Sequence, residues 1–245
     1  MSNLSRRKLI TTGLAATAGA SGLAAAARIA DRYGLIPPDW GGVYGPGETL
    51  TYASHRLLTG QSLAREFSPG EISKTPFAKG KHPDGEEFQR LRAGGFAGWK
   101  LAVEGMVARP GSLSLAELRS YPSSSQITHL ACEEGWSFIA QWIGVPLAHV
   151  LNVVGILPQA RYVVYFSMQD RWWDSIDMAD ALHPQTLLTY GMNGSELSVG
   201  HGGPLRLRVA RQLGYKSVKF IHRMIVTADL KEFPPKGRYA WYAGI

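Results

Sequence analysis

Apolar and polar residues alternate along several stretches of the chain with the two-residue period of a half-buried β-strand. The clearest case is 99–107, where Trp99, Leu101 and Val103 fall on one face. The stretch 161–167 is almost continuously Val, Tyr and Phe, which predicts a strand buried on both faces. We expect strands at 99–107, 126–131, 161–167, 185–192, 205–210 and 222–227.

Short segments between these strands carry helix-boundary signals. The capping box Ser114–Glu117 predicts a short helix that ends near Tyr121. Pro146, in a first-turn position, and Gly155, just past the end, bound a second helix. A third short helix is expected at 175–182.

The sequence Asn193-Gly194 follows the strand expected at 185–192 and is a strong signal for a hairpin turn. Short strands joined by turns, few helices and no internal repeats favour an α+β fold with mostly antiparallel or mixed strands. A chain of 245 residues with 45% apolar residues can bury a substantial core.

Residues 1–30 have the composition of an export signal. The pair Arg6-Arg7 precedes an uncharged, weakly apolar run at 9–27 that ends in alanine-rich cleavage candidates. Paired arginines before such a run favour twin-arginine export to the periplasm, a route that carries folded proteins and suits a cofactor inserted beforehand. An ordinary secretory signal and an uncleaved membrane anchor are the alternatives.

The stretch 31–49 is rich in proline and glycine and is interpreted as a linker. Residues 50–245 are then expected to form one domain, because no further boundary is visible in the sequence.

Composition narrows the function classes. The net charge is +7, but residues 1–30 supply four basic residues and no acid, and the remainder is nearly balanced. Neither this balance nor any motif favours binding to nucleic acid. The single cysteine excludes an intrachain disulfide, an all-cysteine zinc site, an iron–sulfur cluster and a covalently attached haem.

That cysteine, Cys132, stands before Glu133 and Glu134, where negative charge opposes a reactive thiolate. A metal ion would reverse this effect, because coordination removes the thiol proton. A cysteine–histidine nucleophile and a zinc site with His129 are further alternatives, the latter with crowded spacing. From local chemistry alone, a buried structural cysteine is the default.

Residues 198–228 contain no acid and several glycines, together with Arg206, Arg208, Arg211, Lys216, Lys219 and Arg223. Basic side chains beside exposed backbone N–H groups suit a phosphate, although a solvated basic face fits the charge pattern equally well. No Walker motif and no Gly-x-Gly-x-x-Gly are present, which disfavours a nucleotide in a standard phosphate loop.

Several linked motifs resemble the sulfite oxidase superfamily of molybdopterin-dependent oxidoreductases, most closely the periplasmic methionine sulfoxide reductase catalytic subunits. The segment Cys-Glu-Glu-Gly-Trp-Ser at 132–137 resembles the molybdenum-cysteine segment. The resemblance continues, in order and with nearly the same spacing from about Phe96 to Asp229, through 142–147, 181–188, 201–206 and 213–219. It implies a sulfite-oxidase-type fold for 50–245.

The resemblance implies that Cys132 is the thiolate ligand of a molybdenum ion held by one molybdopterin. Glu134 aligns with an acid near the metal, as a proton-handling group or only a solvated acid. The implied pterin- and phosphate-binding residues are Ser167, His201, Arg206, Ser217, Val218 and Lys219. At Ser167 the reductase branch usually has Thr, and at His201 it has Asn where the sulfite-oxidising branch has His.

The upstream Asn-x-x-Tyr-Glu motif of the reductase branch is not recognisable. His55 and Arg56, in Ser54-His55-Arg56, are predicted to replace it. Trp136, Trp172 and Trp173 could shape the pocket, but packing is the more ordinary role of tryptophan.

The function implied is a two-electron oxygen-atom transfer on a small oxo substrate, sulfoxide-like or sulfite-like. The chain is expected to be a monomeric catalytic subunit without the immunoglobulin-like dimerisation domain of sulfite oxidases. It would need an external electron partner, such as a membrane cytochrome b or a soluble cytochrome c. The competing hypothesis is a non-catalytic exported binding domain of the same fold with a structural Cys132.

Overall fold

The structure is a computed structural model that describes residues 22, 24–31, 33–39, 45–235 and 241–244. The chain divides into two compact units, Met1–Thr59 and Gly60–Ile245. Most of the predicted export signal lies outside the described residues, although 24–31 are helical. Within the described ranges, no helix is both long and apolar enough to cross a membrane.

Helix α2 (Gly45–Leu58) corrects the linker interpretation for residues 45–49, which form its first turn and a half. Proline and glycine suggested an irregular segment here, but Pro46 and Gly47 occupy only the first turn of the helix. Backbone N–H groups in the first turn have no partner within a helix, so proline, which lacks an N–H, loses no hydrogen bond there. The following sequence, Glu48 to Leu58, contains neither residue type. The helix therefore propagates once its first turn has formed.

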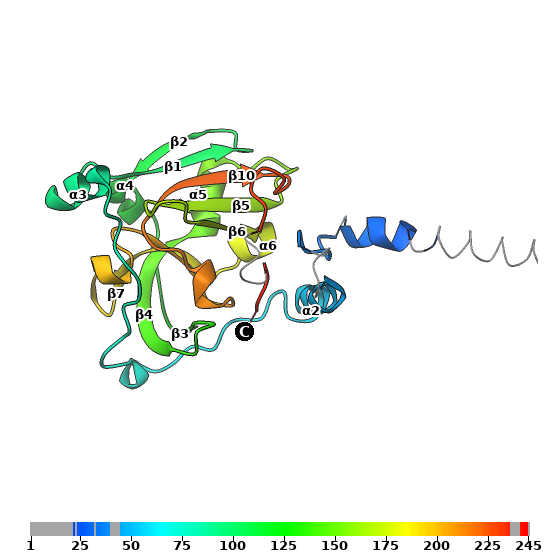
Figure 1. The fold of residues 1–245 in the computed structure, drawn as a ribbon, viewed down its shortest axis with the longest axis horizontal. Helices are drawn as coiled ribbons and strands as arrows, with labels where there is room; N and C mark the ends of the chain where they lie inside the picture. The colour runs from blue at the N-terminus through cyan, green and yellow to red at the C-terminus, as the bar shows by residue number, and fades with distance from the viewer. Residues whose placement is uncertain (1–21, 23, 32, 40–44, 236–240, 245) are drawn as a thin grey trace, which may run out of the picture. The chain divides into compact units, whose positions relative to one another are not determined.

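Two five-stranded sheets form the second unit (Figure 1). The first has the order β2 (Gly111–Ser114), β1 (Lys100–Gly105), β10 (Ile221–Thr227), β5 (Tyr162–Ser167) and β6 (Trp173–Asp177). The second has the order β3 (Ser124–Ala131), β4 (Ser137–Pro146), β7 (Thr186–Met192) and β8 (Ser195–Glu196), with β9 (Arg206–Val209) also paired to β7. Among the strands of the described residues, only β1 and β10 pair in parallel. The predicted α+β fold with mostly antiparallel strands is confirmed.

Short helices and 3-10 turns precede β1 or connect these strands. They are η1 (Pro69–Glu71), α3 (Glu86–Ala93), α4 (Leu115–Ser120), α5 (Leu147–Val154), α6 (Met178–Ala181), η2 (Val199–His201) and η3 (Gly214–Lys216). The capping box is confirmed at α4, where the Glu117 amide donates to Ser114 Oγ over 3.2 Å. The helix α5 also ends as predicted, with Gly155 in the left-handed conformation.

The expectation of a helix over 175–182 is wrong in its first half. Ser175 and Ile176 pair with β5 as part of β6, and the helix begins only at Met178. Asp177 explains the boundary, because its side chain accepts a hydrogen bond from the Asp180 amide over 2.9 Å and caps the helix. The sequence analysis also missed β2, β4, α2 and α3.

The main apolar core lies between the two sheets and under α5. Leu101 and Val103 from β1, and Val163 and Tyr165 from β5, are buried there with residues of β4, β7 and β9. A smaller apolar cluster contains Trp142 and other residues of the β3–β4 hairpin, together with Met192 and Leu197. Burial alternates along β3 and β4, so their large apolar side chains lie on one face, and this fixes the register because a one-residue slip would expose them.

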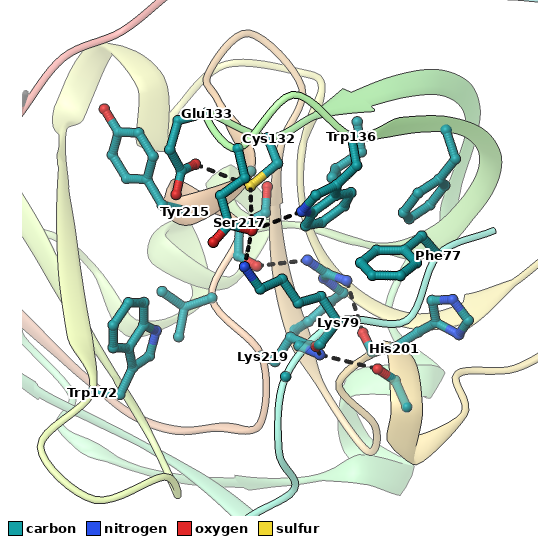
Figure 2. A pocket seen from close by; sticks show the side chains of 18 of the residues that line it. Phe77, Lys79, Cys132, Glu133, Trp136, Trp172, His201, Tyr215, Ser217 and Lys219 are labelled. Atoms are coloured by element: carbon teal, nitrogen blue, oxygen red, sulfur yellow. Dashed lines mark hydrogen bonds and ion pairs between the residues drawn. The ribbon is translucent and has the colours of Figure 1, made fainter. Parts of the chain in front are cut away.

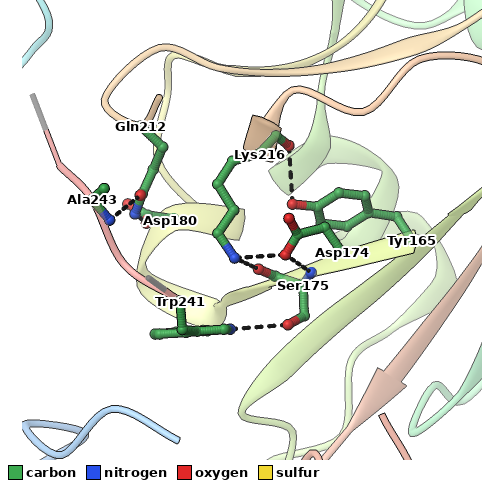
Figure 3. A network of polar contacts seen from close by, with 8 residues as sticks. All are labelled: Tyr165, Asp174, Ser175, Asp180, Gln212, Lys216, Trp241 and Ala243. Carbon is green, nitrogen blue, oxygen red and sulfur yellow. Dashed lines mark hydrogen bonds and ion pairs between the residues drawn. The ribbon is translucent and has the colours of Figure 1, made fainter. Parts of the chain in front are cut away.

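A buried polar network holds η3 in place (Figure 3). Lys216 is 1% exposed, and its Nζ donates to Asp174 Oδ1 over 2.6 Å and to the Ser175 carbonyl over 2.8 Å. The Tyr165 hydroxyl donates to the Lys216 carbonyl, and Trp241 Nε1 donates to Ser175 Oγ. The network fixes the segment that precedes residues 217–219.

Replacing Asp174 by Ala should lower the free energy of unfolding by about 3 kcal/mol, because it leaves the Lys216 ammonium buried without a carboxylate. The control is Asp170→Ala, whose ion pair with Arg171 is exposed and should change stability by no more than about 0.5 kcal/mol. Urea unfolding measures both variants. Equal effects would contradict the role of the network.

Candidate functional site

A pocket of about 300 Å³ opens beside the β3–β4 turn (Figure 2). Five parts of the chain line it: the β3–β4 turn, the β5–β6 connection, the region of η2 and β9, the segment of η3 leading to β10, and a loop before α3. Seven of the predicted site residues line this one pocket: Cys132, Glu134, His201, Arg206, Ser217, Val218 and Lys219.

The β3–β4 turn presents Cys132 to the pocket. The Cys132 amide donates to the Trp136 carbonyl over 3.0 Å, and Gly135 closes the turn with a φ of 90°. This left-handed conformation favours glycine, so the sequence Glu133-Glu134-Gly135 fits a tight turn. Strand β3 therefore ends by placing the thiol at the pocket wall.

The surroundings of Cys132 disfavour a free thiolate. Burial, together with a hydrogen bond from Sγ to Glu133 Oε2 over 3.2 Å, raises the pKa of the thiol to about 12. Glu134 Oε2 lies 3.9 Å from the same sulfur. A nucleophile needs a lowered pKa, whereas a metal ion would displace the proton whatever the neighbouring charge. The geometry therefore favours a metal ligand over a nucleophile.

His129 lies away from this site. Its neighbours in β3, Thr128 and Leu130, are buried, and strand alternation places the His129 side chain on the opposite face. Its ring packs against Phe67 with centroids 6.4 Å apart, while Leu130 lines the pocket. A zinc site or a nucleophilic dyad that pairs His129 with Cys132 is disfavoured.

The opposite wall carries buried positive charge. Arg206 is 6% exposed and donates to the His201 carbonyl over 2.8 Å and to the Ser217 carbonyl over 2.7 Å, but its buried Nε has no hydrogen-bond partner among the described residues. Burial lowers the pKa of its guanidinium to about 10. Arg206 forms no ion pair with any described carboxylate, so its charge is not offset.

Arg208 and Lys219 also form no ion pair with a described carboxylate. Burial, followed by repulsion from Arg206, lowers the pKa of Arg208 to about 9 and that of Lys219 to about 8. Their hydrogen bonds, within the described part of the chain, go to carbonyl and hydroxyl oxygens. Lys219 also explains Gly202, because a Cβ there would stand 2.6 Å from Lys219 Cγ.

His201 lies between the two walls as a neutral ring. Burial lowers the pKa of His201, and Arg206 and Lys219 lower it further. Its Nε2 lies 3.3 Å from the Pro76 carbonyl, which can only accept, so Nδ1 accepts from Ser198 Oγ over 2.9 Å. The imidazole thus contributes hydrogen bonds without adding positive charge.

The loop before α3 was missed by the sequence analysis. We call residues 76–81 the strap; its Phe77, Lys79 and Gly80 line the pocket. Lys79 forms an ion pair with Glu134, and the Phe77 and Trp136 rings lie 5.1 Å apart. A lysine between small residues in an irregular stretch carried no signal of this placement. Gln169, Tyr215 and Trp172 are further lining residues.

Three predicted residues do not join the pocket set. Ser167 is 6% exposed, and its Oγ accepts from the Gln169 amide over 3.0 Å, so it orders the turn that carries Gln169. His55 and Arg56 belong to α2, in the first compact unit. A role for these residues in pterin binding stays a prediction.

Comparison with known families gives the identity of the fold. The model of the oxidoreductase molybdopterin binding domain matches residues 91–233. The chain belongs to this family. The predicted membership of the sulfite oxidase superfamily is thereby confirmed, and the matched range contains the Cys132 turn and the opposite wall, which carries Arg206 and Lys219.

Curated relatives carry related names. A putative protein-methionine-sulfoxide reductase subunit YedZ1 of Azospira oryzae is 38% identical over 72% of this chain and 66% of its own length. Catalytic subunits MsrP of protein-methionine-sulfoxide reductase, from Ralstonia nicotianae and Xanthomonas campestris, are 33% and 35% identical over 51% and 53% of this chain. The chain spans 43% and 47% of those two relatives.

Among solved structures, the sulfane dehydrogenase SoxCD of Paracoccus pantotrophus has a similar fold. The TM-score is 0.53 at 18% identity, over 69% of this chain and 46% of that one. This likeness supports the sulfite-oxidase-type fold alone.

The residues present fit a molybdopterin. Arg206, which is buried and has an unpartnered Nε, and Lys219, which is half-buried, line the pocket, and an anionic phosphate there would compensate their charges and that of the nearby buried Arg208. A soft thiol from Cys132 stands on the other wall as a donor for a metal ion. The two requirements of the group, an anion site and a sulfur ligand, meet in one cavity.

Cys132 is the only thiol, so alkylation of the metal-free protein reports on it alone. At pH 8, iodoacetamide should react on the order of 1000-fold more slowly with the folded than with the urea-unfolded protein, because its pKa is about 12 against an ordinary value of 9.0. Glu133→Ala should accelerate the folded-state reaction. Equal rates in the folded and unfolded states would contradict the described environment.

Proposed function

We propose that the chain is an exported molybdenum-cofactor oxidoreductase that catalyses two-electron oxygen-atom transfer on a small oxo substrate. The observation that carries the proposal is the convergence, in one pocket, of the lone thiol with buried cations that lack carboxylate partners. Membership of the molybdopterin-binding family implies a group that would bind both the thiol and the cations.

In this proposal one molybdopterin per chain supplies a metal ion that changes its oxidation state by two electrons. Cys132 holds the metal as a soft donor, without its proton. Arg206 and Lys219 hold the phosphate by charge and hydrogen bonds, and Arg208 adds positive potential from behind Arg206. The backbone of residues 217–219 also contributes to the site for the phosphate.

The protein also shapes the space around the thiol. Trp136 donates from Nε1 to Glu134 Oε2 over 2.8 Å and stacks on Phe138 at 6.2 Å. This arrangement holds the Glu134 carboxylate, which also pairs with Lys79, at the Cys132 end of the pocket. The aromatic faces beside it suit a substrate with an apolar body.

The names of the relatives favour a sulfoxide as the substrate and reduction as the direction. Two of them are named as catalytic subunits, which supports a separate electron partner for this chain. With one cysteine the chain cannot hold an iron–sulfur cluster, so we propose a membrane cytochrome b or a soluble cytochrome c in that role.

Protein purified after expression with molybdate should contain molybdenum and a pterin that fluoresces on oxidation. Arg206→Ala should lower the occupancy of both about tenfold, because it removes a buried cation from the phosphate. The matched control is Arg223→Ala, since Arg223 lies in the same basic segment but pairs with Glu104 outside the pocket.

The loaded protein should then reduce sulfoxides with an artificial electron donor faster than it oxidises sulfite with an artificial acceptor. Folded wild-type protein without molybdenum or pterin would contradict the proposed function and favour a non-catalytic binding domain with a structural Cys132. Loaded protein that is inactive on both substrate classes would contradict the substrate assignment alone.

Export rests on Arg6-Arg7 and the weakly apolar run after it. Replacement of both arginines by lysine should leave the protein in the cytoplasm, because the twin-arginine route reads this pair. Cell fractionation and immunoblotting measure the distribution. Unchanged export of the variant would indicate an ordinary secretory signal.

A further inference from the structure

The strap is tied to the pocket wall through its carbonyl groups. His201 Nε2 donates to the Pro76 carbonyl over 3.3 Å, Gln169 Nε2 donates to the Lys81 carbonyl over 2.7 Å, and Lys219 Nζ donates to the Lys79 carbonyl. These three donors come from three different connections of the fold and all line the pocket. The strap is therefore held by residues that line the pocket, and one of them, Lys219, belongs with Arg206 to the basic wall, which we call the anion wall.

Two side chains of the strap reach the opposite wall. Lys79 pairs with Glu134, and the Phe77 ring tilts against Trp136 at 5.1 Å. Glu134 and Trp136 belong to the turn that presents Cys132. Figure 2 shows Lys79 extending between the anion wall and this turn. We call these two contacts the clasp.

The clasp crosses a pocket whose two walls would hold the two ends of one ligand. We propose that Lys79 and Phe77 are positioning residues that clasp the Cys132 turn across the pocket and so slow the release of a molybdopterin bound beneath. The inference rests on the proposed function. The strap lies within the second compact unit, as the pocket does. The chain contains no Asn-x-x-Tyr-Glu motif, and the inference assigns a ligand-retaining role to the strap.

The balance of charges explains why a lysine suits this position. Glu133 and Glu134 follow Cys132 directly, and Lys79 is the cation that pairs with Glu134. Both partners are partly exposed, at 44% and 40%, so water screens the pair while the pocket is open. A ligand that fills the pocket removes this water and strengthens the pair.

Release of pterin from the loaded protein tests the clasp, with fluorescence of the oxidised pterin in the filtrate as the readout. Lys79→Met should shorten the half-time about fivefold, which corresponds to about 1 kcal/mol. Lys79→Arg should restore most of it. Lys74→Met is the matched control, because Lys74 is exposed and precedes the strap, and it should release pterin at the wild-type rate.

A double variant separates a specific pair from a general loosening. Glu134→Gln should release pterin as fast as Lys79→Met, and the combined variant should be no faster than either, because both changes break one contact. Additive effects, or a Lys79→Met rate equal to that of Lys74→Met, would overturn the proposal even though the loaded wild type supports the proposed function.

A second measurement needs no cofactor. The ratio of the rates at which a bulky maleimide and iodoacetamide modify Cys132 reports access, because both reagents require the same thiolate. Lys79→Met and Phe77→Ala should raise this ratio and Lys74→Met should not. An unchanged ratio in the first two variants would show that no clasp covers the thiol, whether or not the protein binds molybdopterin.

Discussion

The constraint on which the site depends is the positive charge at one wall of the pocket, which no described carboxylate offsets. Arg206 and Arg208 are buried and Lys219 is half-buried, none has a carboxylate partner among the described residues, and burial and mutual repulsion lower the pKa values of these groups. Such an arrangement is costly in an isolated fold, because burial removes the water that would stabilise each cation. An anion in the pocket turns the same residues into a binding site. The network around Lys216, whose charge is matched by Asp174, shows that this chain pairs a buried cation where no ligand is needed.

The Cys132 thiol on the other wall lacks a partner that would remove its proton. Burial and the neighbouring Glu133 raise the pKa of the Cys132 thiol, which slows its reaction with electrophiles. A metal ion is the partner that this environment does not exclude, since coordination replaces the proton. The pocket therefore has an end that requires an anion and an end that accepts a metal. The strap joins the two ends, because it is anchored on the cation side and contacts the Cys132 turn.

Local sequence patterns predicted most of the β-structure, including the strand that ends directly before Cys132. Alternation located β1 and β3, and the Asn193-Gly194 turn is confirmed by the positive φ of both residues. Strand β4 was missed although Phe138, Ala140 and Trp142 alternate there. The acid-free segment contains Arg206 and Lys219, which line the pocket in the structure. The strap had no such signal, since its role depends on tertiary hydrogen bonds from His201, Gln169 and Lys219.

X-ray absorption at the molybdenum edge tests the central claim most directly, because it counts the sulfur atoms bound to the metal. The loaded wild type should show one sulfur ligand more than loaded Cys132→Ser, with the pterin content of the variant measured in parallel. That loss of a single sulfur is the result predicted for a thiolate ligand. An unchanged sulfur count in the loaded variant would contradict it and would leave Cys132 as a structural residue.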